Sequence, residues 1–230
     1  MDPAAYLTAG IVAICTGLDR TAALQVMLCR PLVAGPLTGW LLGDPQSGLL
    51  VGLLLELLWL GRLPVGAAIP PDDTQVAVGA TTLALTMGPH LQQGGPGFVI
   101  LCLLVAMPLG KISQLFERLA RNWNGRLVPE AEGAVEAGRL RGVENLHLWG
   151  LGHFGIASLA TFAFIVAGGS VILVFVAPPL QNLFAHAAGP LRVVLPLVGV
   201  AAILGTINVH RVLTLFGASF ASALLMLWLL

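Results

Sequence analysis

Long apolar runs separated by short polar interruptions extend along almost the whole chain. Eight such runs predict helices: Ala4–Leu18, Ala22–Leu42, Ser47–Leu60, Val65–Gly88, Phe98–Gly110, Leu151–Pro178, Pro190–Gly205 and Val212–Leu230. A helix needs about 20 apolar residues to span a bilayer, and several of these runs are shorter or interrupted. The pattern therefore predicts an all-α polytopic membrane protein in which some helices are broken or re-entrant.

Two of the runs contain helix-breaking residues near their centres. Arg30 and Pro31 divide the second run. Because proline removes a backbone donor, we expect that helix to be kinked or split, with Arg30 either snorkelling or paired. Pro70 and Pro71 interrupt the fourth run, which we expect to break there and resume as a helix capped by Asp72 or Asp73.

The remaining polar segments predict loops. Residues 111–144 are the only long polar stretch and contain six of the eleven lysines and arginines, so the positive-inside rule predicts a cytoplasmic loop of about residues 111–147. Gly88–Gly97 and Gln181–Pro190 are further predicted loops. The N-terminus lacks a basic region and a small-residue cleavage site, so we interpret it as a retained membrane segment. Residues 1–230 then form a single membrane-embedded domain.

Composition and charge exclude several classes of protein. Hydrophobic residues make up 57% of the 230 residues and charged residues only 10%, whereas a soluble domain carries about 25% charged residues. The net charge of zero gives no indication of a nucleic-acid partner. Cys15, Cys29 and Cys102 lie far apart in apolar runs, so we expect small buried side chains rather than a disulfide or a metal site. No soluble catalytic motif is present, and we expect no catalytic residue, cofactor or metal.

Glu56 is the first candidate for a functional side chain, because it stands alone among seven apolar residues, LLLELLWL. A charged residue at membrane depth costs about 2.5–3.5 kcal/mol on insertion scales, so such residues usually have a function. Glu56 could accept hydrogen bonds from sugar hydroxyls or carry a proton. Alternatively, it is a structural carboxylate paired with Arg30 or Arg62, and the two roles are compatible.

Four further side chains are candidates for a binding site. Asp72 and Asp73 follow the proline pair, where both are also ordinary helix-start residues. Trp59 could stack on a sugar ring or lie in an interfacial belt. Asn208 interrupts the C-terminal apolar region and offers a donor and an acceptor, or a helix cap.

Four sequence blocks, in order and at matching spacing, resemble the IIC subunit of the mannose/fructose/sorbose family of the bacterial phosphotransferase system. They are RPL at residues 30–32, LGD at 42–44, LEL at 55–57 with LG at 60–61, and VGAAIPPD at 65–72. The strong resemblance covers residues 28–85. The rest of the chain is similar in hydropathy, in its polar loop and in an Ile-Asn pair at residues 207 and 208.

The resemblance implies a multi-pass permease of the bacterial inner membrane that binds and translocates a hexose or amino sugar. It implies a IID membrane subunit and a cytoplasmic IIAB protein as partners, in a homo- or hetero-oligomer. IIAB would phosphorylate the sugar, so this chain would not be catalytic by itself. Glu56 and Asp72, and less directly Asn208, would be parts of the sugar site.

Two other functions remain compatible with the residues. Glu56 and Asp72 could be the coupling carboxylates of a proton- or ion-coupled transporter. The chain could also be a non-transporting sensor or assembly subunit derived from a permease.

Overall fold

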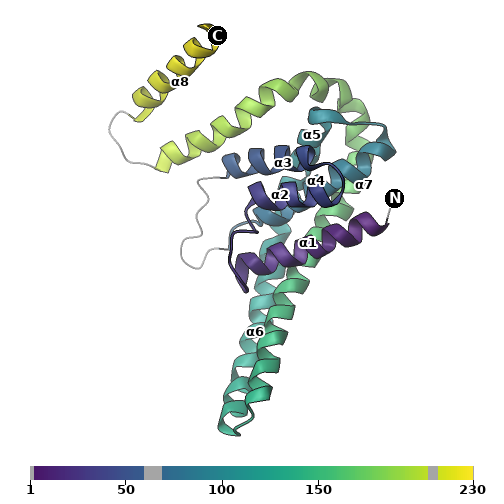
Figure 1. The fold of residues 1–230 in the computed structure, drawn as a ribbon, viewed down its shortest axis with the longest axis vertical. Coiled ribbons are helices and arrows are strands. Elements are labelled where there is room, and N and C mark those ends of the chain that lie inside the picture. Colours follow the sequence, from purple (N-terminus) through teal and green to yellow (C-terminus); the bar gives the residue numbers. More distant parts are fainter. Residues whose placement is uncertain (1–2, 60–68, 207–211, 230) are drawn as a thin grey trace.

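The computed structural model describes residues 3–59, 69–206 and 212–229, and these residues are almost entirely helical (Figure 1). The predicted all-α fold is therefore confirmed. Its elements are α1 (Pro3–Thr21), α2 (Pro31–Leu41), α3 (Pro45–Leu58), α4 (Asp73–Leu91), α5 (Gly95–Leu109), the 3₁₀ turn η1 (Gly110–Ile112), α6 (Ser113–Glu136), α7 (Leu140–Thr206) and α8 (Val212–Leu229).

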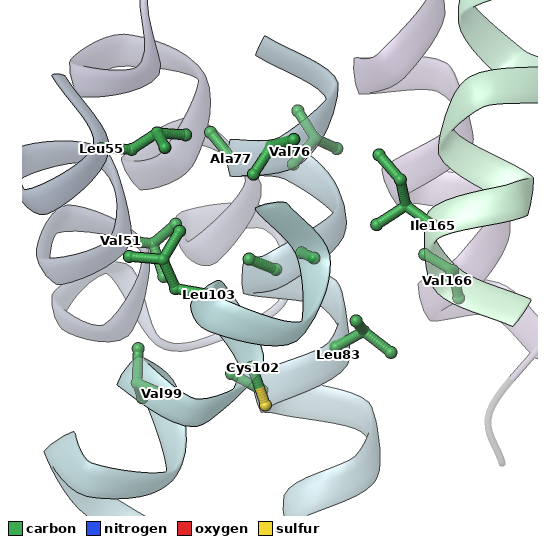
Figure 2. Close-up of a cluster of buried hydrophobic side chains, with 14 of the residues drawn as sticks. Val51, Leu55, Val76, Ala77, Leu83, Val99, Cys102, Leu103, Ile165 and Val166 are labelled. Carbon is green, nitrogen blue, oxygen red and sulfur yellow. The ribbon is translucent and has the colours of Figure 1, made fainter. Parts of the chain in front are cut away.

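Helix α4 lies at the centre of the body and contacts α1, α2, α3, α5 and α7. It is buried on every side over most of its length, because its residues are almost all small or apolar. Figure 2 shows its side chains Val76, Ala77 and Leu83 among residues of α3, α5 and α7. A Cβ added to Gly79 would lie 2.6 Å from Ile165 Cγ2, so the glycine allows α7 to pack directly on α4. The first turns of α4 are consequently enclosed by the surrounding helices.

Helices α2 and α3 form a tight antiparallel hairpin, confirming that the second apolar run is split at Pro31. A Cβ on Gly35 would lie 2.5 Å from the Gly48 carbonyl oxygen, which places the two backbones in direct contact. Gly43 turns the chain between the helices with a φ of +95°. At about 16 and 21 Å, the helices are shorter than the roughly 30 Å apolar layer, as expected for re-entrant segments.

The polar stretch predicted to be a loop is instead a helical hairpin. Helix α6 continues to Glu136 and α7 begins at Leu140, so only a short turn separates them. The hairpin extends away from the other helices (Figure 1). Asn124 of α6 joins the two helices, because its Nδ2 donates to the Gly150 carbonyl oxygen at 3.1 Å and its Oδ1 is hydrogen-bonded to His153 Nδ1 at 2.6 Å.

The prediction of a loop at Gln181–Pro190 is wrong, since α7 is continuous through this region. The helix contains Pro178, Pro179, Pro190 and Pro196, and it bends over the body of the protein in Figure 1. Each proline removes one hydrogen bond and bends a helix without necessarily ending it, and membrane helices tolerate this often. The predicted loop at Gly88–Gly97 is also shorter, because α4 ends at Leu91 and α5 begins at Gly95.

Among the residues that the structure describes, two helical stretches are long and apolar enough to cross a membrane: Gly95–Glu136 and Leu140–Leu204. The cysteines agree only partly with expectation. All three thiols are free and Cys102 is buried, but Cys15 is exposed, so the prediction of burial is wrong there. Its position on a helix of mixed exposure explains the difference, because only one face of α1 packs on the core.

The α2–α3 packing predicts that Gly48→Ala lowers stability. Its added Cβ would overlap the Gly35 carbonyl group, and overpacking of this kind costs about 1–3 kcal/mol. Thermal unfolding of the detergent-purified protein measures the effect. Gly125→Ala on α6 is the matched control, because its Cβ would meet nothing within 4 Å and should stabilise the helix by about 0.5–1 kcal/mol. Equal melting temperatures for the two variants would contradict the packing.

Candidate functional site

Glu56 closes the open end of the α2–α3 hairpin. One of its carboxylate oxygens accepts a hydrogen bond from Arg30 Nη2, and the other lies 3.4 Å from the backbone nitrogen of Leu32. Arg30 is the N-cap residue of α2, so the carboxylate also faces the positive end of that helix. Of the two pairings expected for Glu56, the structure shows the one with Arg30, while Arg62 lies outside the described residues. The Glu56 side chain is 12% exposed and that of Arg30 49% exposed.

Asp72 is the N-cap of α4, as expected from the sequence. Its Oδ1 accepts a hydrogen bond from the Gln75 backbone nitrogen at 3.0 Å, and its Oδ2 pairs with Arg20 Nη1 at 2.6 Å. Its own backbone nitrogen donates to Ser113 Oγ at 2.9 Å. Because Asp72 is buried, these contacts replace the water that a carboxylate would otherwise need.

The extended segment before Asp72 is held from two sides. Gln114 Nε2 of α6 donates to the Ile69 carbonyl oxygen at 2.7 Å, and Arg20 Nη2 of α1 lies 3.5 Å from the Pro70 carbonyl oxygen. These side chains pair with carbonyl groups that no helix satisfies. The proline pair is therefore non-helical backbone held by side chains of α1 and α6, while residues 65–68 of the predicted fourth helix lie outside the described residues.

Arg20 belongs to a chain of alternating charges that the sequence interpretation missed. It lies 4.0 Å from Glu117 Oε2, and Glu117 Oε1 in turn pairs with Arg121 Nη2 at 2.6 Å. The order Asp72–Arg20–Glu117–Arg121 joins α4, α1 and α6. The i,i+4 spacing of Glu117 and Arg121 is a recognisable signal in the sequence. The pairing of Arg20 is not, because its partners are about 50 and 100 residues away.

The loop between α1 and α2 links the two carboxylates. Asp19 is buried, and its two carboxylate oxygens accept hydrogen bonds from the backbone nitrogens of Val26 at 2.7 Å and Cys29 at 3.0 Å. Thr74 Oγ1, in the first turn of α4, donates to the Cys29 carbonyl oxygen at 2.6 Å. Three of the loop residues have left-handed backbone conformations, which are uncommon outside glycine: Leu24, Gln25 and Met27. The loop is therefore fixed by Asp19 in a conformation it would not adopt alone.

Arg20 and Arg30 flank this loop, and each binds one of the two candidate carboxylates. Arg20 at its start binds Asp72, and Arg30 at its end binds Glu56. Breaking either ion pair would therefore release one end of the same loop between α1 and α2. This arrangement couples the α2–α3 hairpin to the start of α4.

The other candidate residues have different surroundings. Asp73 begins α4, and its Oδ1 accepts a hydrogen bond from the Thr74 backbone nitrogen at 3.0 Å. Trp59 lies in the hydrophobic core after α3, only 9% exposed, rather than in an exposed belt. Asn208 lies outside the described residues. Within the described ranges, no group of three or more His, Cys, Asp or Glu side chains could hold a metal ion.

The space beside Asp72 is small in this conformation. A hollow next to it has a volume of about 10 Å³, which is room for about one water molecule. Its polar lining includes Glu117 and the hydroxyl groups of Ser113, Ser158 and Thr161. Access of a larger polar ligand to Asp72 at this hollow would therefore require the surrounding helices to move.

These features define an all-helical membrane protein with two arginine-paired carboxylates, one of which caps the helix that follows the proline pair. Over residues 4–229 the chain matches the family described as the sorbose-specific IIC component of the phosphotransferase system, and it belongs to that family.

Individual relatives match shorter stretches. The chain is 43% identical over 79 residues to the putative N-acetylgalactosamine permease IIC component 2 of Escherichia coli K12, covering 34% of this chain and 59% of that protein. It is 32% identical over 119 residues to the fructose permease IIC component of Bacillus subtilis 168, covering 52% and 41%. For the mannose-specific EIIC component of E. coli K12 the identity is 29% over 119 residues, covering 52% and 42%. The matches thus span about half the length of these relatives.

Two solved structures share the fold. A chain described as a membrane protein superposes with a TM-score of 0.70 at 21% identity, covering 97% of this chain and 87% of that one. A cryoEM structure of the mannose transporter ManYZ with microcin E492 (MceA) gives a TM-score of 0.61 at 20% identity, with the same coverage. The membrane-protein fold is therefore shared by experimental structures.

The charge chain predicts that Arg20→Gln is strongly destabilising. The substitution would leave Asp72 and Glu117 buried without their shared cation, and losing one partner of a buried pair costs about 3–5 kcal/mol. Thermal unfolding in detergent measures the loss. Arg139→Gln, at an exposed arginine in the α6–α7 turn, should change stability by less than about 0.5 kcal/mol. If both variants unfold at the same temperature, Arg20 does not hold the network together.

Proposed function

We propose that this chain is the sugar-translocating IIC subunit of a phosphotransferase system, with a hexose or amino sugar as substrate. The observation that carries the proposal is the family match over residues 4–229, supported by two arginine-paired carboxylates, one of which caps the start of α4. The names of the relatives support this substrate class, since they specify N-acetylgalactosamine, fructose, sorbose and mannose. The chain acts as a multi-pass protein of the bacterial inner membrane.

The proposal includes two partners. A IID membrane subunit would complete the permease, and a cytoplasmic IIAB protein would phosphorylate the sugar. Residues 111–144, which run from η1 through α6 into the start of α7, support a cytoplasmic location for that end of the molecule, because they contain six of the eleven lysines and arginines. Because IIAB would carry out the phosphorylation, this chain would need no catalytic residue of its own.

In the proposed mechanism, sugar hydroxyls replace arginines as the partners of Glu56 and Asp72. The Arg30–Glu56 pair is the easier one to open, because half of the Arg30 side chain is exposed and such pairs contribute about 0–1 kcal/mol. The Arg20–Asp72 pair is buried and also bound to Glu117. Binding would therefore begin at Glu56, and movement of the loop between the two arginines would then open the region around Asp72. Asn208, Asp73 and Trp59 are proposed as further contacts of the same sugar site.

A binding screen tests the function. Hexoses and amino sugars are titrated against the chain purified with its IID partner, and uptake is measured in cells that contain IIAB. A saturable sugar that is lost in Asp72→Asn, together with phosphoenolpyruvate-dependent uptake, is the expected result. Uptake that depends on a proton gradient instead would indicate an ion-coupled transporter. An intact complex that binds no sugar would indicate a sensor or assembly subunit.

A pair of variants separates the ligand role of Glu56 from its structural role. Both Glu56→Gln and Arg30→Gln break the same ion pair and should lower stability by similar, small amounts. Glu56→Gln should also weaken sugar binding about tenfold, because it removes charge-assisted hydrogen bonds to the ligand. Arg30→Gln should bind sugar as well as the wild type or better, since it releases the carboxylate. Calorimetric titration that gives unchanged affinity for Glu56→Gln would exclude Glu56 as a ligand.

A further inference from the structure

Arg192 is isolated in the most apolar part of the sequence. It is the only Asp, Glu, Lys or Arg side chain between Glu144 and Arg211. No ion pair involving Arg192 occurs among the described residues. A cation in such a segment is costly unless an anion or water compensates its charge, so its surroundings indicate what it binds.

Arg192 lines a pocket of about 350 Å³ between α7 and the start of α5. On α7, Gln181, Phe184, Ala188 and Arg192 face the pocket at helical spacing. Gln93 lies on the opposite wall, in the turn before α5. Small residues on α7, Ala188 and Gly189, leave the hollow open, while Gly97 on α5 allows the two helices to approach closely at its edge. The volume is within the range of small-molecule sites.

The charges and donors of the pocket favour an anion. Its lining contains one guanidinium group, two side-chain amides and no carboxylate. A guanidinium group binds phosphate through two parallel hydrogen bonds, and amide groups can donate to the remaining oxygens. Backbone nitrogens of the first α5 turn lie at the same wall, and Gly94, the N-cap residue, provides no side-chain cap. The cavity and the Arg192 guanidinium group are the main features of the site, and the start of α5 adds backbone donors.

The position of the pocket also favours a phosphate. It lies at the first turn of α5, whereas the charged α6–α7 hairpin follows the other end of that helix. Figure 1 shows α5 beside α7, with the hairpin extending in another direction. The end of an apolar helix is where lipid headgroups meet a membrane protein. Soluble phosphate esters could reach the same place from the aqueous side.

We propose that the pocket formed by Arg192, Gln181 and Gln93 between α5 and α7 binds a phosphate group. Its source is either the headgroup of an anionic phospholipid or a soluble phosphate. This site is separate from Glu56 and Asp72, and it does not depend on the proposed sugar function. Lipid or phosphate bound here would fix α7 against the body of the protein.

The test measures phosphatidylglycerol retained by the detergent-purified full chain, with native mass spectrometry as the readout. Arg192→Gln removes the charge, and Ala188→Leu fills the hollow without changing charge. Both should reduce retention about tenfold, as expected for loss of a charge-assisted contact. Arg139→Gln and Ala201→Leu are the matched controls, at exposed positions outside the pocket, and should retain lipid like the wild type.

Competition separates the two sources of phosphate. Displacement of the lipid by millimolar inorganic phosphate would assign the site to soluble phosphate, and resistance to it would assign the site to a lipid headgroup. Equal retention in all five proteins would overturn the proposal. Loss in Arg192→Gln but not in Ala188→Leu would overturn it as well, because the contact would then lie outside the pocket. If a variant fails to fold, the wild type still decides: retention of diacylglycerol equal to that of phosphatidylglycerol would exclude phosphate recognition.

Discussion

A carboxylate buried in an apolar protein has to be paired with a cation or bound by hydrogen-bond donors, and this requirement determines how the first half of the chain is arranged. Asp72 and Glu117 are both buried, and Arg20 lies between them. An isolated buried charge costs several kcal/mol, so α1, α4 and α6 must meet where these side chains converge. Glu56 places the same demand on α2 and α3, and Arg30 satisfies it.

The loop between the two arginines makes these pairings interdependent. Asp19 fixes its backbone, and Thr74 joins it to the first turn of α4. The α2–α3 hairpin, held together by glycine contacts and the Arg30–Glu56 pair, is thus joined to α4 through the Thr74–Cys29 hydrogen bond as well as through apolar packing. Such polar attachments can exchange partners, whereas close packing resists gradual change. A polar ligand could therefore move the hairpin by exchanging partners with these polar groups, without disrupting the packed core.

Helix breaks and helix caps were predictable from the sequence, because they depend on residues that are neighbours along the chain. The split at Pro31, the non-helical backbone at the proline pair and the capping role of Asp72 all follow from proline geometry and short side-chain contacts. The continuous α7 was not predictable, because membrane helices can accommodate prolines that would normally mark a loop. The role of Arg20 was not predictable, because its partners Asp72 and Glu117 lie far away in the sequence. The sequence shows that Glu56 is isolated among apolar residues, but its pairing with Arg30 depends on how α2 and α3 pack as a hairpin.

The central claim is that ligand binding at the carboxylates is transmitted to the loop between Arg20 and Arg30. Hydrogen–deuterium exchange of the purified complex, with and without saturating sugar, tests it most directly. The account predicts a change in exchange at the Val26 and Cys29 amides, which are bound to Asp19, with no change along α6 beyond Arg121. Unchanged exchange at these two amides, under conditions where sugar binding is demonstrated, would contradict the account.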